Sequence, residues 1–266
     1  MKNRILTSSL VFILVLITAL FASWLVLEER VVSYLAHVEI DPSQFETNLE
    51  KSLDVAEFDF SVIDELGLSG VMPYINEDVA PIGEIIIPNV DIHLPIFHGI
   101  TEPHISLGAA TLTPNQQMGQ GNYSLASHYT PWGMLFGALD QVEMGDLIIL
   151  RDDIYLYLYE ATFNEVIEAY LVEIIEVVPE KTLITLITCT PDGLMRVAVQ
   201  GEFIQQVLIT DLMSEQITLN VEATPLEIMP LLEIEVIQFP FFEVASAMIG
   251  SLMMAGLVTW LVSKKN

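Results

Sequence analysis

Three residues that could carry acyl-transfer chemistry stand at the ends of β-type runs in this sequence. Cys189 directly follows the run Leu-Ile-Thr-Leu-Ile-Thr and precedes a Thr-Pro-Asp-Gly turn. His128 follows the run Asn-Tyr-Ser-Leu-Ala-Ser, and Arg196 opens a third run in which valines alternate with other residues. A thiol needs a base or a cationic neighbour to become a good nucleophile, and histidine can supply either. The three residues together suggest a cysteine nucleophile, a general acid–base and a positively charged group.

Each of these residues also has a purely structural interpretation. A lone cysteine is often a small buried hydrophobe. Cys189 is the only cysteine, which excludes an intramolecular disulfide and a CxxC zinc site. Arg196 could instead form a surface ion pair in so acidic a chain. The position of Cys189 at a strand end favours a reactive role, because functional groups concentrate where loops are carried on rigid strands. On these residues alone, both interpretations stay open.

The composition excludes several classes of protein. Of the 266 residues, 52% are hydrophobic, which is incompatible with a wholly disordered chain. Nine Lys and Arg against 36 Asp and Glu give a formal net charge of −27. No nucleic-acid partner is expected, because such binding depends on neutralising phosphates. With five histidines and no HExxH motif, an ordinary zinc enzyme is also unexpected. The acidic residues indicate a solvated surface, or adaptation to a low-pH or saline exterior.

Two uncharged apolar segments flank the acidic part of the chain. Residues 5–27 and 244–262 contain no charged side chain, and each is long enough to cross a bilayer as a helix. In the second segment Ala247, Ser251 and Ala255 recur every four residues, which suits close helix contact. Basic residues occupy the outer flanks of both segments, so the positive-inside rule predicts a two-pass protein of the cell membrane with cytoplasmic termini and an extracellular middle. A cleaved signal peptide and a buried globular helix are the alternatives.

Between these segments the pattern changes once, from helix to strand. Residues 31–80 are acidic, and a short amphipathic helix is expected to start at Asp41, which precedes a proline. From residue 81 the sequence consists of short β runs, with a hairpin signal at Asp152-Asp153 whose second arm alternates tyrosine with aliphatic residues. Many short strands with few helices predict a mainly β protein, either a closed barrel or a sandwich. Within this region, helices are expected only over residues 132–139 and 170–177.

Residues 82–203 as a whole resemble a sortase. The matches include a first strand Ile-Gly-Glu-Ile-Ile-Ile-Pro, the run Met-Gly-Gln-Gly-Asn-Tyr before His128, a Thr-Leu-Ile-Thr-Cys strand ending at Cys189, and Arg-Val-Ala-Val-Gln-Gly-Glu from Arg196. A TLxTC strand followed by an R-x-x-V-x-G strand, with an upstream Asn-Tyr and His, is a specific combination. On these motifs the chain is identified as a member of the sortase family, the cysteine transpeptidases of Gram-positive cell surfaces.

The resemblance implies a fold and a division of the chain. The fold would be a sortase-type closed β-barrel of about eight strands with short helices, flanked here by two transmembrane helices. The expected parts are an N-terminal tip and anchor (1–30), an acidic helix and linker (31–80), the catalytic barrel (81–205), a second acidic linker (206–243) and a C-terminal transmembrane helix with its cytoplasmic tip (244–266).

The resemblance also implies an activity and roles for the residues. The enzyme would cleave an LPxTG-like signal between Thr and Gly and hold the acyl product as a thioester on Cys189. His128 would protonate the leaving amine and deprotonate the incoming one, and Arg196 would bind the substrate backbone or the oxyanion. Thr188 and Ser127 are the expected substrate-binding residues, in a groove roofed by the segment before the cysteine strand.

The expected partners follow from the same resemblance. They are LPxTG-bearing surface proteins, the amine of a lipid-linked peptidoglycan precursor, and the membrane. No metal or organic cofactor is required, although some sortases bind calcium.

A few departures from the family's motifs indicate which class of sortase the chain resembles. The run before His128 resembles class A sortases of the streptococcal kind, many of which have a second histidine where Tyr129 stands here. The second membrane span resembles class C pilin polymerases, but their Asp-Pro-aromatic lid motif is missing. Class A with an extra anchor is therefore preferred. A class C enzyme that joins pilin subunits through a lysine amine and a hydrolytic cysteine protease are the alternatives. The interval from Cys189 to Arg196 is shorter than usual, which leaves the placement of the guanidinium open.

Overall fold

The computed structural model divides the chain into two compact units. One comprises Met1–Leu35 and Val236–Asn266, and the other is Ala36–Glu235. The structure describes residues 9–21, 23, 38–58, 72–74, 77–130, 133–213, 246, 249–251, 253–256 and 260.

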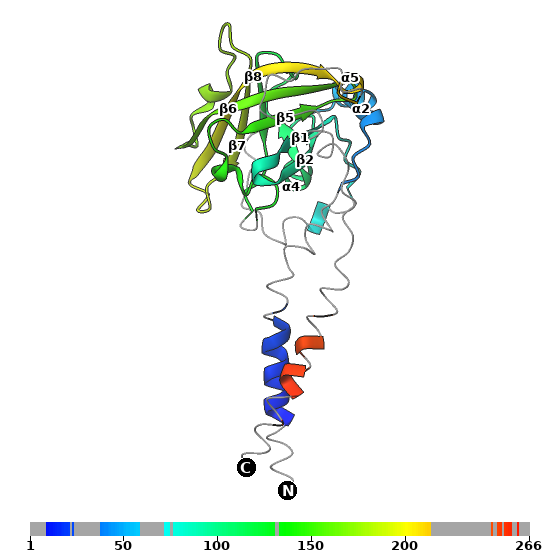
Figure 1. The fold of residues 1–266 in the computed structure, drawn as a ribbon, viewed down its shortest axis with the longest axis vertical. Coiled ribbons are helices and arrows are strands. Elements are labelled where there is room, and N and C mark those ends of the chain that lie inside the picture. Colours follow the sequence, from blue (N-terminus) through cyan, green and yellow to red (C-terminus); the bar gives the residue numbers. More distant parts are fainter. Residues whose placement is uncertain are drawn as a thin grey trace. The chain divides into compact units, whose positions relative to one another are not determined.

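The larger unit is built on a closed barrel of eight strands (Figure 1). The order around the barrel is β1-β2-β3-β4-β7-β8-β6-β5. The β2–β3 and β4–β7 pairs are parallel and the others antiparallel. The closed barrel predicted from the sequence is therefore confirmed. The strands are β1 (Gly83–Ile87), β2 (Ile92–Phe97), β3 (Ala109–Thr111), β4 (Asn122–Ala126), β5 (Leu147–Arg151), β6 (Tyr155–Glu168), β7 (Leu183–Cys189) and β8 (Met195–Leu208).

Strand β6 shows how alternation along the sequence builds two buried layers. Tyr157 and Tyr159 belong to the main core, whereas Leu156 and Leu158 belong to a second apolar cluster that includes residues of α5 (Ile209–Met213). Both faces of this strand are therefore covered, as its alternating pattern indicates.

The hairpin predicted at Asp152 is confirmed as the connection between β5 and β6. The Asp152 carboxylate accepts hydrogen bonds from the backbone N–H groups of Ile154 and Tyr155 and from the Tyr157 hydroxyl. These bonds satisfy the polar groups of the turn and fix where the second arm begins.

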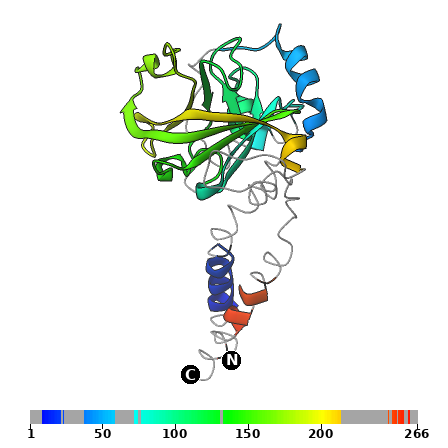
Figure 2. The same cartoon turned by 45° about the horizontal axis from the view of Figure 1, so that its top comes forward.

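The helices of the larger unit are short, and α2 lies outside the barrel strands (Figure 2). The predicted helix start at Asp41 is confirmed, since its side chain accepts from the Ser43 N–H. Asn48 of α2 donates to the Pro81 carbonyl at 2.8 Å, which fastens the helix to the start of the barrel. These elements are η1 (Pro42–Gln44), α2 (Phe45–Ser52), η3 (Met72–Tyr74), η4 (Pro88–Val90), α4 (Glu102–Leu107), η5 (Leu139–Gln141) and η6 (Val172–Ile175).

The helix predicted over residues 132–139 is wrong for the part of it that the structure describes. Gly133 and Leu135 have φ angles of 78° and 53°, which no right-handed helix accommodates. The Thr130 hydroxyl donates to the Met134 carbonyl at 2.6 Å and stabilises the turn instead. The helix predicted over residues 170–177 is reduced to the short 3₁₀ segment η6.

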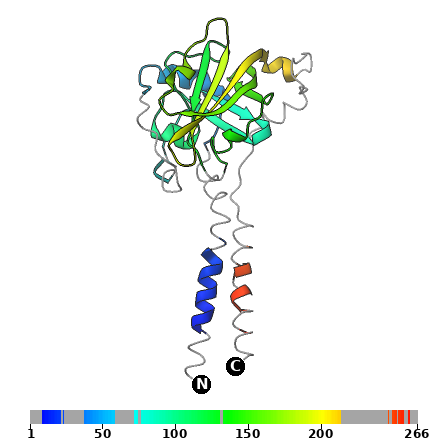
Figure 3. The same ribbon diagram turned by 90° about the vertical axis from the view of Figure 1, so that its left-hand side faces the viewer.

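In the smaller unit, two helical segments from opposite ends of the chain run side by side (Figures 1 and 3). The Ser23 and Ser251 hydroxyl oxygens lie 3.0 Å apart. Ser251 and Ala255 are buried while Met253 and Met254 are exposed, so the small-residue face predicted from the sequence is the face in contact. Its third member, Ala247, lies outside the described residues.

Within the described residues, no helix combines the length and the apolar character needed to cross a bilayer. The two predicted spans, residues 5–27 and 244–262, lie partly outside those residues. The flanking transmembrane helices of the predicted fold class are therefore not confirmed, and the two-pass topology stays a prediction.

Candidate active site

Strand register places Cys189 between the other two predicted catalytic residues. β4 and β7 run parallel and pair up to Ala126 and Ile187. His128 and Cys189 each follow two residues later, so both emerge at the same end of the barrel. On the other side of β7, Cys189 is paired directly with Arg196 of β8. Because neighbouring strands are about 4.8 Å apart, the three residues form a row across adjacent chain segments.

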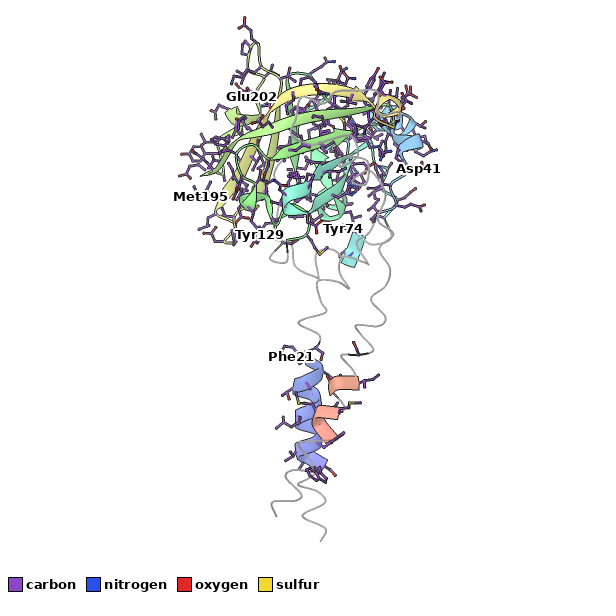
Figure 4. The ribbon with its side chains drawn as sticks, viewed as in Figure 1. Phe21, Asp41, Tyr74, Tyr129, Met195 and Glu202 are labelled. Atoms are coloured by element: carbon purple, nitrogen blue, oxygen red, sulfur yellow. The ribbon has the colours of Figure 1, made fainter. Side chains whose placement is uncertain are left out.

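Figure 4 labels Tyr129, which follows His128, and Met195, which precedes Arg196. Both lie toward the lower left of the barrel, whereas Glu202, farther along β8, lies above them. The strand pairings thus bring the residues that the sequence singled out to one end of the barrel.

Ser127 and Thr188 join the two strand ends that carry His128 and Cys189. The Thr188 hydroxyl donates to the Ser127 carbonyl at 2.9 Å, and the Ser127 hydroxyl donates to the Gly108 carbonyl at 2.6 Å. Both residues are buried. Their hydroxyls therefore fix the backbone next to the row of three residues. The substrate contacts expected of Thr188 and Ser127 stay a prediction.

His128 is held from both sides by the backbone. Its N–H donates to the Ile105 carbonyl and its carbonyl accepts from the Phe136 N–H, each at 3.3 Å. The side chain is only 2% exposed, and its Nε2 lies 3.5 Å from the Glu102 carboxylate. Sequence reasoning missed Glu102, because nothing in its local sequence relates it to a strand end that comes later in the chain.

Arg196 lies at the hairpin that joins β7 and β8, and its side chain is bonded to the backbone of that hairpin. Its Nη1 donates to the carbonyls of Met195 at 3.0 Å and Gly193 at 3.3 Å. The short interval from Cys189 to Arg196 therefore does not displace the arginine from the cysteine, because a tight turn lets the two residues pair in register.

The turn itself is organised by a carboxylate. Asp192 accepts from the Thr190 hydroxyl at 2.6 Å and from the Leu194 N–H at 3.1 Å. The Thr190 hydrogen bond, followed by that of Leu194, lowers the pKa of Asp192. Gly193 has a φ of 72°, in the left-handed region that favours glycine. The Thr-Pro-Asp-Gly run after the cysteine is thus a preformed turn.

A polar network fastens the η6 segment to the same three strands. Asn122 of β4 donates to the carbonyls of Ile174 and Glu176 at 2.9 and 3.0 Å. Gln200 of β8 also donates to the Ile174 carbonyl, at 3.0 Å, and Thr185 of β7 donates to Asn122 at 2.7 Å. We refer to Asn122, Thr185 and Gln200 as the clamp.

The clamp occupies the same face of the β4-β7-β8 sheet as His128, Cys189 and Arg196. We refer to these three residues as the candidate catalytic row, or catalytic row for short. Side chains two residues apart on a strand share a face, so Thr185 lies on the same face as Cys189, and Gln200 on the same face as Arg196. Between the clamp and the row lie Ala126, Ile187 and Ala198, which are small or apolar. Ile175 of η6 and Ile187 both pack against the cluster that contains Ala126.

Metal ligands are not assigned in this site. In the ranges that the structure describes, no three or more His, Cys, Asp or Glu side chains are grouped so that they could hold a metal ion.

Comparison with known proteins identifies the family. The crystal structure of sortase A from Listeria monocytogenes has a TM-score of 0.48 and 34% identity, covering 52% of this chain and 96% of that one. The sortase domain family model matches residues 85–204. Sortase A of Streptococcus agalactiae serotype III (strain NEM316) is 33% identical over 176 residues, or 62% of this chain and 71% of that protein. Sortase A of Listeria monocytogenes serovar 1/2a is 33% identical over 190 residues, which cover 69% of this chain and 83% of that protein. From these sequence matches, the chain belongs to the sortase family and is class A-like.

Proposed function

We propose that this chain cleaves an LPxTG-like sorting signal between Thr and Gly and transfers the surface protein to the amine of a lipid-linked peptidoglycan precursor. Sortases are cysteine transpeptidases that act on surface proteins with sorting signals. The observation that carries the finer proposal is the register that pairs Cys189 with Arg196 on one side and aligns it with His128 on the other.

The first half-reaction forms the thioester. The Cys189 thiolate attacks the threonine carbonyl carbon, and the carbon–nitrogen bond to glycine then breaks. Protonated His128 gives its proton to the departing amine, which leaves as a neutral group. Arg196 stabilises the oxyanion of the tetrahedral intermediate. Its Nη1 donates to two carbonyls of the turn, and a guanidinium has further N–H donors to offer to the oxyanion.

The second half-reaction transfers the acyl group. The precursor amine attacks the thioester carbonyl, His128 takes up its proton, and the Cys189 thiolate leaves as the new amide forms. A histidine that is neutral in one step and protonated in the other can serve both, because its charge changes near physiological pH. These steps use no metal or organic cofactor.

The sorting peptide is proposed to lie on the sheet face between the clamp and the catalytic row. Ile187 is partly exposed and offers an apolar contact for leucine or proline, with the buried Ala126 and Ala198 beside it and η6 at its border. Ser127 and Thr188 support this surface from the strand ends. The clamp fastens the roof segment, residues 168–181, to the sheet through the Ile174 and Glu176 carbonyls.

The topology proposed is a two-pass membrane protein with an extracellular catalytic unit and cytoplasmic termini. The support is the uncharged character of residues 5–27 and 244–262, with basic residues on their outer flanks. The Ser23–Ser251 contact within the smaller unit is compatible with a pair of neighbouring helices. Protease treatment of intact protoplasts tests the proposal. A tag placed after Asn266 should survive, and its digestion from outside would contradict the second span.

The activity is tested with the full-length protein in detergent micelles, an LPxTG peptide and an added amine, with the products identified by mass. The expected product joins the amine to the threonine carboxyl carbon, and Cys189→Ala serves as the control. A free threonine acid despite saturating amine would indicate a hydrolytic protease. Transfer only to a lysine ε-amine in a pilin-like peptide would indicate the class C activity.

A further inference from the structure

Glu102 places a carboxylate against the candidate acid–base residue. Its Oε2 lies 3.5 Å from His128 Nε2. The glutamate side chain is 28% exposed and the histidine 2%, so the carboxylate borders solvent while the imidazole does not. Glu102 lies outside the motifs that identified the site.

The helix that carries Glu102 is rigidly attached to the His128 segment. Glu102 is the first residue of α4, and Ile105 lies one turn later, on the same side of the helix. The Ile105 carbonyl accepts from the His128 N–H at 3.3 Å and from the Ser127 hydroxyl at 3.4 Å. Thr101 caps the helix through its side chain. The Glu102–His128 contact is therefore held at both ends by backbone hydrogen bonds.

We propose that Glu102 is the positioning residue that orients the His128 imidazole and stabilises its protonated form. The inference rests on the proposed function, in which His128 must hold a proton to release the glycine amine. A carboxylate beside a histidine favours the imidazolium over the neutral ring. A partner on one ring nitrogen also fixes the rotation of the ring, as the acid of a catalytic triad does for its histidine.

Other charged and titratable groups lie on the chain segments around His128. Arg196, in the row on β8, opposes a second positive charge at this end of the barrel, and Cys189 lies between them. Tyr129 is the next residue in the chain. His104, also on α4, donates from Nδ1 to the Gly99 carbonyl at 2.7 Å and stacks on Phe97. Burial lowers the pKa of His104, so it is neutral near pH 7. Glu102 is thus the carboxylate that the structure places beside His128.

The first experiment compares pH profiles of transpeptidation by full-length wild type, Glu102→Gln and Asp153→Asn. The control also loses one negative charge, but Asp153 precedes β6 at the end opposite the Glu168–Met195 pair, away from Arg196. For Glu102→Gln the alkaline limb of kcat/KM should move to lower pH by about 0.5 to 1 unit, with a several-fold loss above pH 7.5. Asp153→Asn should keep the wild-type limb. If the alkaline limb of the kcat/KM profile of Glu102→Gln coincides with that of wild type, the proposal is overturned.

The second experiment does not depend on the substrate. NMR of isotope-labelled histidine in the full-length protein in micelles follows the titration of His128, which is assigned by its loss in His128→Gln. Glu102→Gln should lower the titration midpoint by about 0.5 to 1 unit. If the midpoint shifts but wild type cleaves no LPxTG peptide, the proposed function fails and the positioning role stands. If wild type cleaves the peptide and the midpoint does not move, the positioning role fails alone. A thermal unfolding midpoint equal to wild type confirms that the variant is folded.

Discussion

The most informative stability test removes one charge from a buried ion cluster on the barrel wall. Glu84 of β1 is completely buried. One of its carboxylate oxygens accepts from Arg151 Nη1 at 2.9 Å, and the other lies 2.6 Å from His93 Nε2. Arg151 is the residue paired with Glu84 across the β1–β5 ladder. The cluster therefore connects three neighbouring strands around a fully buried carboxylate, whereas its His93 side chain is 29% exposed.

The expected cost of Glu84→Gln follows from this burial. The amide keeps the size of the carboxylate but removes the negative charge that pairs with the Arg151 guanidinium, which is 12% exposed. Removing one partner of a buried ion pair costs about 3–5 kcal/mol. The glutamine oxygen can still accept one hydrogen bond, so we expect the lower part of that range, about 3 kcal/mol. For a unit of this size, that lowers Tm by about 6–12 °C.

The control for this prediction is an ion pair that is shorter but exposed. Lys181 Nζ lies 2.5 Å from the Glu202 carboxylate, and both side chains are about half exposed. Glu202→Gln should therefore cost less than about 1 kcal/mol, because solvent screens the pair. Thermal and urea unfolding followed by far-UV circular dichroism measure both variants at pH 7. Equal losses in the two variants would refute the argument that burial, rather than distance, sets the contribution.

Five further predictions concern the candidate site and the stability of the fold. Cys189→Ala should abolish cleavage in the mass assay, because the chain has no other thiol, and residual turnover would reassign the nucleophile. His128→Ala should lose about 10²–10⁴-fold in kcat/KM. Arg196→Lys should lose at least about tenfold, because an ammonium cannot reproduce the planar fork; near-normal rates would reduce Arg196 to a generic cation. Asn122→Ala should raise the KM for the peptide by removing two bonds to the roof, while the rate of Cys189 alkylation by iodoacetamide stays unchanged. Finally, burial lowers the pKa values of His98 and His104, so the folded state binds fewer protons than the unfolded state and stability should fall as pH drops below about 6.5. A pH titration of Tm that stays flat down to pH 5 would contradict this.

The juxtaposition of His128, Cys189 and Arg196 could be predicted from the sequence because each of them marks the end of a β run. Alternation of valine with other residues after Arg196 specifies which of its neighbours share a face, and the register confirms that Val197 and Val199 are in the core. The same period-two logic places the tyrosines of β6 on one face. Local sequence patterns therefore predict on which face of a strand a side chain lies and where the strand ends.

Contacts between segments that local patterns do not relate could not be predicted in this way. Glu102 and His128 meet because α4 returns the chain to the end of β4, and no spacing in the sequence encodes that return. The helix expected over residues 132–139 failed for a different reason. Gly133 was visible in the sequence, but the left-handed conformation of Leu135 depends on the turn that Thr130 stabilises. Positive φ in non-glycine residues favours Asn, Asp and His, so nothing in the sequence marks Leu135 for it.

The clamp could be predicted from the sequence only in part. Asn122, Thr185 and Gln200 each occupy an outward position on a strand, so their shared orientation could be derived from alternation alone. Their mutual contact could not, because it requires β4 to pair with β7 in parallel while β8 pairs on the other side. The same two pairings align His128, Cys189 and Arg196. One fact of topology, the insertion of β7 between β4 and β8, therefore creates both the catalytic row and the attachment of the segment above it. A substitution that shifts the register of β7 by one residue would turn Cys189 and Thr185 to the opposite face together. Loss of thiol reactivity and release of η6 should thus occur in the same variants.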